Sequence, residues 1–168
     1  GDDPDREGLL ETPKRFADMM AEQFAYTAVS NEDIAREFEK TFATPENDMV
    51  VVKDISIFSH CEHHIALMYN MKAAVGYIPH GRVIGLSKIA RIADAVSKRF
   101  QIQERIGTDI RDVMEMVTDS PDGIVYIEGE HSCMTARGIK KPGTRTRTIA
   151  SSGAFKTDSA LRGEFMKL

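Results

Sequence analysis

Both cysteines of the chain stand close to histidines, a combination typical of metal sites. The segment FSHCEHHIALMY places Cys61, His63 and His64 within four positions, and EGEHSCMTARG places His131 two residues before Cys133. A Cys-x-x-His pair can chelate one zinc ion from a single turn of chain. Because each segment ends a predicted strand, two strand ends that meet in an antiparallel sheet would supply Cys61, His64 and Cys133 as three ligands.

Three protein ligands leave one position of a tetrahedral zinc ion open to water, which distinguishes a catalytic site from a structural one. Two alternatives stay open. The cysteines could form a buried free pair, or a structural zinc ion could take His63 or His131 as its fourth ligand. A single disulfide would be unusual in a chain with this much core material, so we expect reduced thiols and a cytoplasmic location.

His63 and His131 each lie within two residues of a proposed ligand. A neutral imidazole can accept or deliver a proton near neutral pH, as hydrolytic chemistry requires. The alternative is that both only hydrogen-bond to groups around the metal, which is common in such sites. We therefore treat them as candidate acid and base groups.

Two basic segments could bind an anionic ligand. GLSKIARI begins a helix at Ser87, whose free N–H groups suit phosphate, and Lys88 and Arg91 share a face of its first turn. ARGIKKPGTRTRT gathers cationic residues after Cys133, and Arg137 is the nearest of them to that ligand. In a chain of net charge -4 this indicates a small polyanion rather than nucleic acid. A solvated helix start is the simpler interpretation of GLSKIARI alone.

The dipeptide Gln103-Glu104 stands at the junction of two predicted helices. A carboxylate can accept two hydrogen bonds from the N1–H and exocyclic amine of guanine, and adenine lacks that pair of donors. By itself the dipeptide is equally consistent with an exposed helix turn.

The elements that must position these residues follow from the spacing of apolar side chains. Residues 1–45 read as a helical region, with one helix beginning at Thr12-Pro13 and a second capped by Ser30 or Asn31 and extending to Phe42. The remainder, 46–168, reads as one domain of the order ββααββ. Its strands are predicted at 49–59, 67–78, 123–134 and 144–155, and its helices at 87–100 and 103–117.

This order favours an α+β fold in which an antiparallel sheet carries helices on one face. Another copy of the chain is the expected cover for the other face. The composition, 42% hydrophobic and 29% charged, is that of a globular protein. No apolar run approaches the roughly 20 residues that span a bilayer, and no signal peptide pattern is present, so we expect no membrane partner.

Taken together and in this order, the motifs resemble the GTP cyclohydrolase I family. DPDREGLLETPKRF, SHCEHH, GYIPHGRVIGLSKIARI, QIQERIG and EHSCMTARGIKKPGT follow the family's order and spacing over nearly the whole chain. CEHH, GLSKIxRI, QxQER and HxCxxARG are highly specific as a set, although no single one is. One departure is the segment IALMYNMKAAVG, which carries one residue more than the common family form.

The resemblance implies a tunnelling fold and a homodecamer of two stacked pentamers with active sites at subunit interfaces. It also implies a zinc-dependent opening of the guanine imidazole ring of GTP to give 7,8-dihydroneopterin triphosphate and formate, the first step of folate-type pterin synthesis. The family's zinc ligands fall on Cys61, His64 and Cys133, and its catalytic histidines fall on His63 and His131.

The family's substrate contacts can be carried over in the same way. Its guanine-binding pair falls on Gln103 and Glu104. Its triphosphate contacts fall on Ser87, Lys88, Arg91 and Arg137, and Arg15 of TPKRF resembles a further triphosphate ligand supplied by a neighbouring subunit.

Two other functions compete with this interpretation. A non-catalytic, zinc-stabilised oligomer that binds a purine nucleotide as a regulator would need no open metal position. A different reaction on the same fold, such as pterin-forming or nitrile-reducing chemistry on a ligand without phosphates, would need no Lys88, Arg91 and Arg137.

Overall fold

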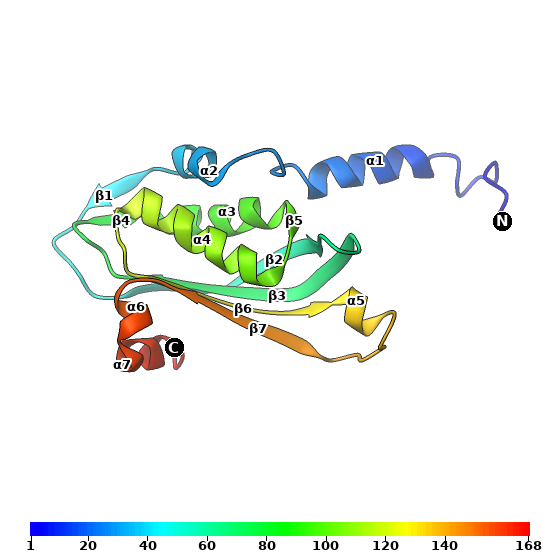
Figure 1. The fold of residues 1–168 in the computed structure, drawn as a ribbon. Helices are drawn as coiled ribbons and strands as arrows, with labels where there is room; N and C mark the ends of the chain where they lie inside the picture. Colours follow the sequence, from blue (N-terminus) through cyan, green and yellow to red (C-terminus); the bar gives the residue numbers. More distant parts are fainter.

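A curved, mainly antiparallel sheet forms the centre of the molecule in the computed structural model, which describes residues 1–168 (Figure 1). Its strands lie in the order β5-β2-β3-β6-β7, and only the two-residue β5 runs parallel to its neighbour. The bounds of these strands are β2 (Val50–Cys61), β3 (Ala66–Tyr77), β5 (Phe100–Gln101), β6 (Gly123–His131) and β7 (Arg145–Ser151). A separate ribbon pairs β1 (Thr41–Ala43) with β4 (Arg82–Ile84).

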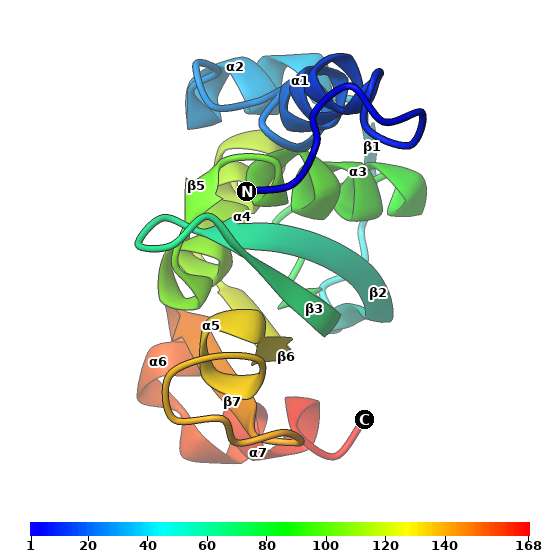
Figure 2. The same ribbon diagram turned by 90° about the vertical axis from the view of Figure 1, so that its right-hand side faces the viewer.

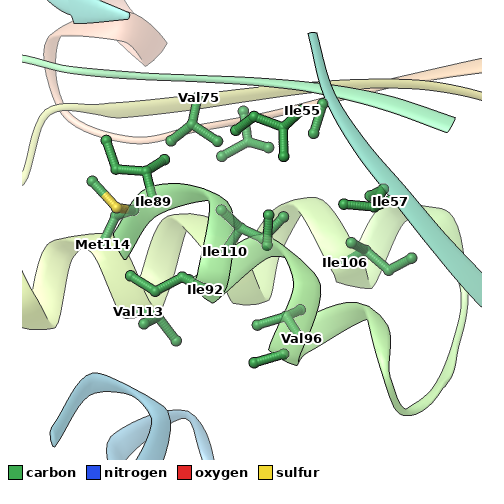
Figure 3. Close-up of a cluster of buried hydrophobic side chains, with 14 of the residues drawn as sticks. Ile55, Ile57, Val75, Ile89, Ile92, Val96, Ile106, Ile110, Val113 and Met114 are labelled. Atoms are coloured by element: carbon green, nitrogen blue, oxygen red, sulfur yellow. The ribbon is translucent and has the colours of Figure 1, made fainter. Parts of the chain in front are cut away.

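Two long helices cover one face of the sheet, as the order ββααββ predicts (Figures 1 and 2). They are α3 (Leu86–Ser97) and α4 (Gln103–Thr118). Their apolar residues recur at three- and four-residue spacing, so one stripe of each helix faces the sheet. Figure 3 shows the resulting cluster, in which Ile89, Ile92, Val96, Ile106, Ile110 and Val113 of the helices meet Ile55, Ile57 and Val75 of the strands. None of the helices is long and apolar enough to cross a membrane.

Only the first part of the N-terminal region extends away from this core, because Ile34, Ala35 and Phe38 are buried in it. Helix α1 (Thr12–Gln23) has no buried residue, and Phe16 is 57% exposed on it. Helix α2 (Asn31–Glu37) begins where it was expected, with a capping box in which Ser30 and Asp33 satisfy each other's backbone N–H groups. Phe42 does not continue this helix as predicted: α2 ends at Glu37, and residues 41–43 pair with β4 instead.

Two short C-terminal helices cover one end of the opposite face, which the sequence pattern did not predict (Figure 2). The strand expected to extend to residue 155 ends at Ser151, and α6 (Ala154–Thr157) and α7 (Ser159–Phe165) follow. Phe165 packs so closely on β3 that a Cβ at Gly76 would lie 2.9 Å from its ring. The rest of this face stays open in one chain, where Phe58 is 58% exposed.

The segment IALMYNMKAAVG, which the sequence predicts to carry one residue more than the common family form, contains a β-bulge at Asn70. Between the pairs Tyr69–Glu130 and Lys72–Glu128, β3 has two residues, Asn70 and Met71, where β6 has only Gly129. Asn70 takes a left-handed backbone conformation with φ of 49°, and its side-chain amide donates to the Glu130 carboxylate at 3.1 Å. The bulge therefore accommodates one extra residue of β3 locally, and the paired registers on both sides of it stay intact.

Candidate metal centre and active site

The three proposed metal ligands meet at one end of the sheet. Cys61 is the last residue of β2, His64 lies in the turn that leads to β3, and Cys133 lies in the short helix α5 (Ser132–Thr135) that follows β6. Their ligand atoms all lie within 4.8 Å of one another, and Cys61 Sγ is 3.9 Å from His64 Nδ1. The antiparallel pairing of strand ends brings them together, as expected from the sequence.

These donors fit a zinc ion. Bond lengths of about 2.3 Å to sulfur and about 2.0 Å to nitrogen place tetrahedral ligand atoms roughly 3.5–3.8 Å apart, so a small contraction of the group would complete the site. The two cysteines are not joined by a disulfide. Burial and the neighbouring Cys61 sulfur raise the pKa of the Cys133 thiol. A divalent cation between the two sulfurs would counter both effects and stabilise the thiolates.

The turn that carries Cys61 and His64 is tied to the start of α4. The Arg105 guanidinium forms an ion pair with the Glu62 carboxylate and donates to the Phe100 carbonyl at 2.8 Å. The Glu62 N–H donates to the Gln101 carbonyl at 2.9 Å. These residues are not metal ligands themselves, but their contacts hold the turn that carries Cys61 and His64 in place.

A second set of contacts fixes α5 and its ligand, Cys133. The Tyr69 hydroxyl lies 2.9 Å from Thr135 Oγ1 and 3.3 Å from a Glu130 carboxylate oxygen. The Ser132 hydroxyl donates to the Leu67 carbonyl at 2.8 Å. Sequence reasoning missed Tyr69 and Thr135, because neither belongs to a metal-binding pattern and only the strand register brings them together.

His131 is the last residue of β6 and is partly buried beside the metal group. Its Nε2 lies 2.8 Å from Gln103 Oε1. Burial lowers the pKa of His131, and the negative charge of Glu104 raises it by less. The structure therefore favours a neutral imidazole, as a proton acceptor requires.

His63 and Arg137 lie on the exposed side of the site. The ring centroids of His63 and His64 are 6.3 Å apart. Arg137 Nη1 is 3.0 Å from His64 Nε2, which makes Arg137 the one predicted triphosphate contact that a single chain brings to the metal ligands. Glu104 is also exposed here, in the first turn of α4.

Gln103 is buried, whereas the side chain of its neighbour Glu104 is exposed. The Gln103 side chain is only 1% exposed, and its amide makes hydrogen bonds inside the protein. The sequence expectation that Gln103 contacts guanine together with Glu104 stays a prediction. Their side chains nevertheless occupy different environments.

The remaining predicted triphosphate contacts lie elsewhere in the chain. Ser87 and Lys88 begin α3 next to β4, whose Ile84 N–H donates to the Tyr77 hydroxyl at the far end of β3. The 12-residue β3 separates that end from the ligand turn by roughly 35 Å. Arg91 lines a hollow of about 540 Å³ between α2, α3 and β2.

Arg15 lies on the exposed helix α1, where it pairs with Glu11 and contacts none of the proposed metal ligands. Figure 1 shows that α1 extends away from the sheet. One chain thus gathers the proposed metal ligands, both candidate catalytic histidines and Arg137. It does not gather Ser87, Lys88 or Arg15 with them.

Comparison with known proteins identifies close relatives. Residues 1–168 match the family model described as GTP cyclohydrolase I. The chain is 60% identical over 173 residues to GTP cyclohydrolase 1 of Clostridium acetobutylicum, covering 100% of this chain and 89% of the relative. It is 57% identical over 174 residues to the Clostridium botulinum (strain Langeland) protein of the same name, with the same coverage of 100% and 89%. A Clostridium beijerinckii relative, also GTP cyclohydrolase 1, is 58% identical and covers 98% of this chain and 86% of its own.

A solved structure shares the fold at much lower sequence identity. It is the apo form of an archaeosine synthase described as QueF-like, with a TM-score of 0.50 and 17% identity. The likeness covers 66% of this chain and 96% of that one. It supports the α+β tunnelling fold and carries no argument about the reaction.

Proposed function

Because the chain belongs to the GTP cyclohydrolase I family, we propose that Cys61, His64 and Cys133 hold a zinc ion in an active site that a second copy of the chain completes. The activity is the hydrolytic opening of the guanine imidazole ring of GTP with loss of C8 as formate, after which the ribose opens, rearranges and closes into the new ring of 7,8-dihydroneopterin triphosphate. The observation that carries the zinc assignment is the set of three donor atoms within 4.8 Å of one another at the sheet end.

When bound, zinc would supply a Lewis acid that makes water an effective nucleophile near neutral pH. The chain's own residues then manage protons. His131, neutral and beside the metal group, accepts a proton from the water that attacks C8 and returns it to the ring nitrogen N9 as the C8–N9 bond breaks, which leaves a formamide on N7. A second water then cleaves the formamide C8–N7 bond and releases formate, and His63, exposed on the same turn, exchanges the protons of this step with solvent.

The remaining residues hold GTP so that C8 faces the metal. The exposed Glu104 carboxylate accepts from N1–H and the exocyclic amine of guanine. Arg137 binds the triphosphate from the same chain, and Ser87, Lys88, Arg91 and Arg15 bind it from neighbouring copies. Fixing both ends of the substrate lowers the entropy cost of reaching the reactive geometry.

The assembly we propose is a homodecamer in which residues 1–45 contribute to subunit contacts and 46–168 form the catalytic domain. Three features of one chain support an oligomer. The outer edge of β7 and most of the outer edge of β2 have no strand partner. Helix α1 buries none of its apolar residues, and Ser87 and Lys88 lie a strand's length from the metal group.

The experiment incubates purified protein with GTP and follows pteridine absorbance and released formate, before and after treatment with a zinc chelator. We expect both products from zinc-loaded protein, loss of both with the chelator and recovery when zinc is restored. A zinc-loaded, folded protein that yields neither product would contradict the proposed function. Light scattering on the same sample tests the decamer separately.

A further inference from the structure

We propose that Gln103 is a positioning residue that orients His131 through its side-chain amide, and that it does not bind guanine through that side chain. The inference rests on the proposed role of His131 in proton transfer. It follows from the contacts of the Gln103 amide, every atom of which is engaged inside the protein.

The amide nitrogen of Gln103 is held by three acceptors. Nε2 lies 3.1 Å from the Ile127 carbonyl, 3.0 Å from the Thr146 carbonyl and 3.3 Å from Thr148 Oγ1. Two of these acceptors are backbone carbonyls, which cannot donate, so they must face the NH2 group and not the amide oxygen. They fix the amide orientation from two strands, β6 and β7.

The orientation of the amide determines which nitrogen of His131 carries a proton. With Nε2 of Gln103 turned to the carbonyls, its Oε1 faces His131 Nε2 at 2.8 Å. An amide oxygen only accepts, so His131 Nε2 must donate and therefore carries the hydrogen. The other ring nitrogen, Nδ1, is then the one left free to exchange a proton with the substrate.

The burial of Gln103 also argues for a positioning role. At 1% exposure its side chain has no free surface to offer a substrate. Binding guanine through the amide would require breaking hydrogen bonds to β6 and β7, and a buried carbonyl left without a donor is costly. Glu104, exposed beside it, has a free carboxylate for that task.

The hydrogen bonds of the Gln103 amide join helix α4 to strands β6 and β7. Gln103 begins α4, Ile127 and His131 belong to β6, and Thr146 and Thr148 belong to β7. The amide thus sets the ring of His131 against a rigid part of the sheet, two residues before the metal ligand Cys133. Loss of the amide should free the ring to rotate without removing any contact to GTP.

The test separates turnover from substrate binding. Gln103→Met keeps the volume and removes both the donor and the strong acceptor. We expect kcat to fall by roughly tenfold to a hundredfold, with KM for GTP and zinc content close to wild type. The matched control is Thr148→Val, which removes one acceptor of the same amide but leaves Oε1 on His131; its kcat should stay close to wild type. A raised KM with unchanged kcat in Gln103→Met would overturn the inference.

A double-mutant cycle tests whether the effect passes through His131. In a His131→Ala background, Gln103→Met should lower the residual kcat no further, because there is no ring left to orient. A full additional loss would mean that Gln103 acts directly and would overturn the inference. Absence of turnover in zinc-loaded wild type would instead count against the proposed function, so the two failures are distinct.

A measurement on the wild-type protein covers the case in which Gln103→Met does not fold. Solid-state NMR of protein labelled with 15N-histidine reports the protonated ring nitrogen of each of the five histidines. The His131 signals are assigned by their absence from His131→Ala. We expect hydrogen on Nε2 and a bare Nδ1. Hydrogen on Nδ1 with a bare Nε2 would overturn the inference.

Discussion

The two ends of strand β3 differ in how many of the proposed site residues a single chain brings together there. At the Ala66 end, Cys61, His64 and Cys133 converge and His131 is already held by Gln103. At the Tyr77 end, Ser87 and Lys88 begin α3 on a surface where the chain itself places no metal ligand or catalytic histidine. The first end is preformed, whereas the proposed assembly would bring the second to the metal group of another copy.

The difference shows what each part of the reaction demands. Breaking a C–N bond requires groups held to within a fraction of an ångström, and paired strand ends supply that rigidity. A triphosphate is long and highly charged, and cationic side chains on exposed helix turns can bind it with less exact placement. In the proposed enzyme, the groups that break bonds therefore lie within one subunit, and the phosphates are bound between subunits.

The largest expected effect comes from breaking the preformed end. Cys133→Ser should lose zinc and lower kcat by about a thousandfold or more, because the Lewis acid is lost. Metal content by atomic emission and turnover of GTP are measured on the same sample.

His131→Ala is the companion variant at this end. It should keep zinc and lose roughly a hundredfold to ten-thousandfold in kcat, since only proton transfer is removed. Loss of zinc from this variant would make His131 a metal ligand and would revive the structural-zinc alternative.

A smaller effect is expected at the other end. Lys88→Ala should raise KM for GTP by roughly tenfold to a hundredfold, the value of one charged phosphate contact, with zinc content unchanged. Lys98→Ala is the control at the opposite end of α3, because Lys98 is the C-cap residue, pairs with Asp94 and is not a proposed phosphate contact. Equal effects from the two lysines would argue that only general charge matters.

A still smaller effect tests how the preformed end is held. Tyr69→Phe removes the hydroxyl that contacts Thr135 and Glu130, so zinc affinity should fall by about tenfold and stability by about 1 kcal/mol. Tyr26→Phe removes a hydroxyl that contacts Glu37 and none of the proposed metal ligands, and should leave zinc affinity unchanged. Competition with a chromophoric chelator measures both.

The smallest effect lies between the two ends, on the open face of the sheet. Arg145, then Arg147 and Tyr126, hold the pKa of Glu128 down to about 2. A carboxyl with a lowered folded-state pKa stabilises the fold above its unfolded value, and that contribution is lost as pH falls from about 4.5 to about 2. Glu128→Gln should reduce the pH dependence of the free energy of unfolding between about pH 4.5 and about pH 2, measured by denaturant titration at several pH values. Zinc affinity should not change. An unchanged pH dependence would contradict the ion-pair account.

The spacing of chemically active residues allowed most of the preformed end to be predicted. Cys61, His64 and Cys133 fall at strand ends, and antiparallel pairing leaves few ways to arrange them. The helices and strands that carry them have clear periodicity, so the fold class was also accessible. Phe42 was misassigned because a short apolar segment after a helix looks the same whether it continues the helix or pairs as a strand.

Other features depend on contacts that no local pattern encodes. Gln103 looks like an exposed helix residue beside Glu104, and only the approach of β6 and β7 buries its amide. Tyr69 meets Thr135 through a register displaced by the Asn70 bulge. The C-terminal helices were missed because each is short, at four and seven residues, and is stabilised mainly by packing on the sheet.

The most direct test of the account is complementation between two inactive variants. Cys133→Ser and a Lys88→Ala, Arg91→Ala double variant are dissociated, mixed in equal amounts and reassembled, and GTP turnover is compared with each variant treated alone. If each site joins the metal group of one copy to the α3 start of another, random pairing restores about a quarter of wild-type activity. Activity no higher than that of the separate variants, in mixed oligomers confirmed by mass spectrometry, would place the whole site in one chain and contradict the account.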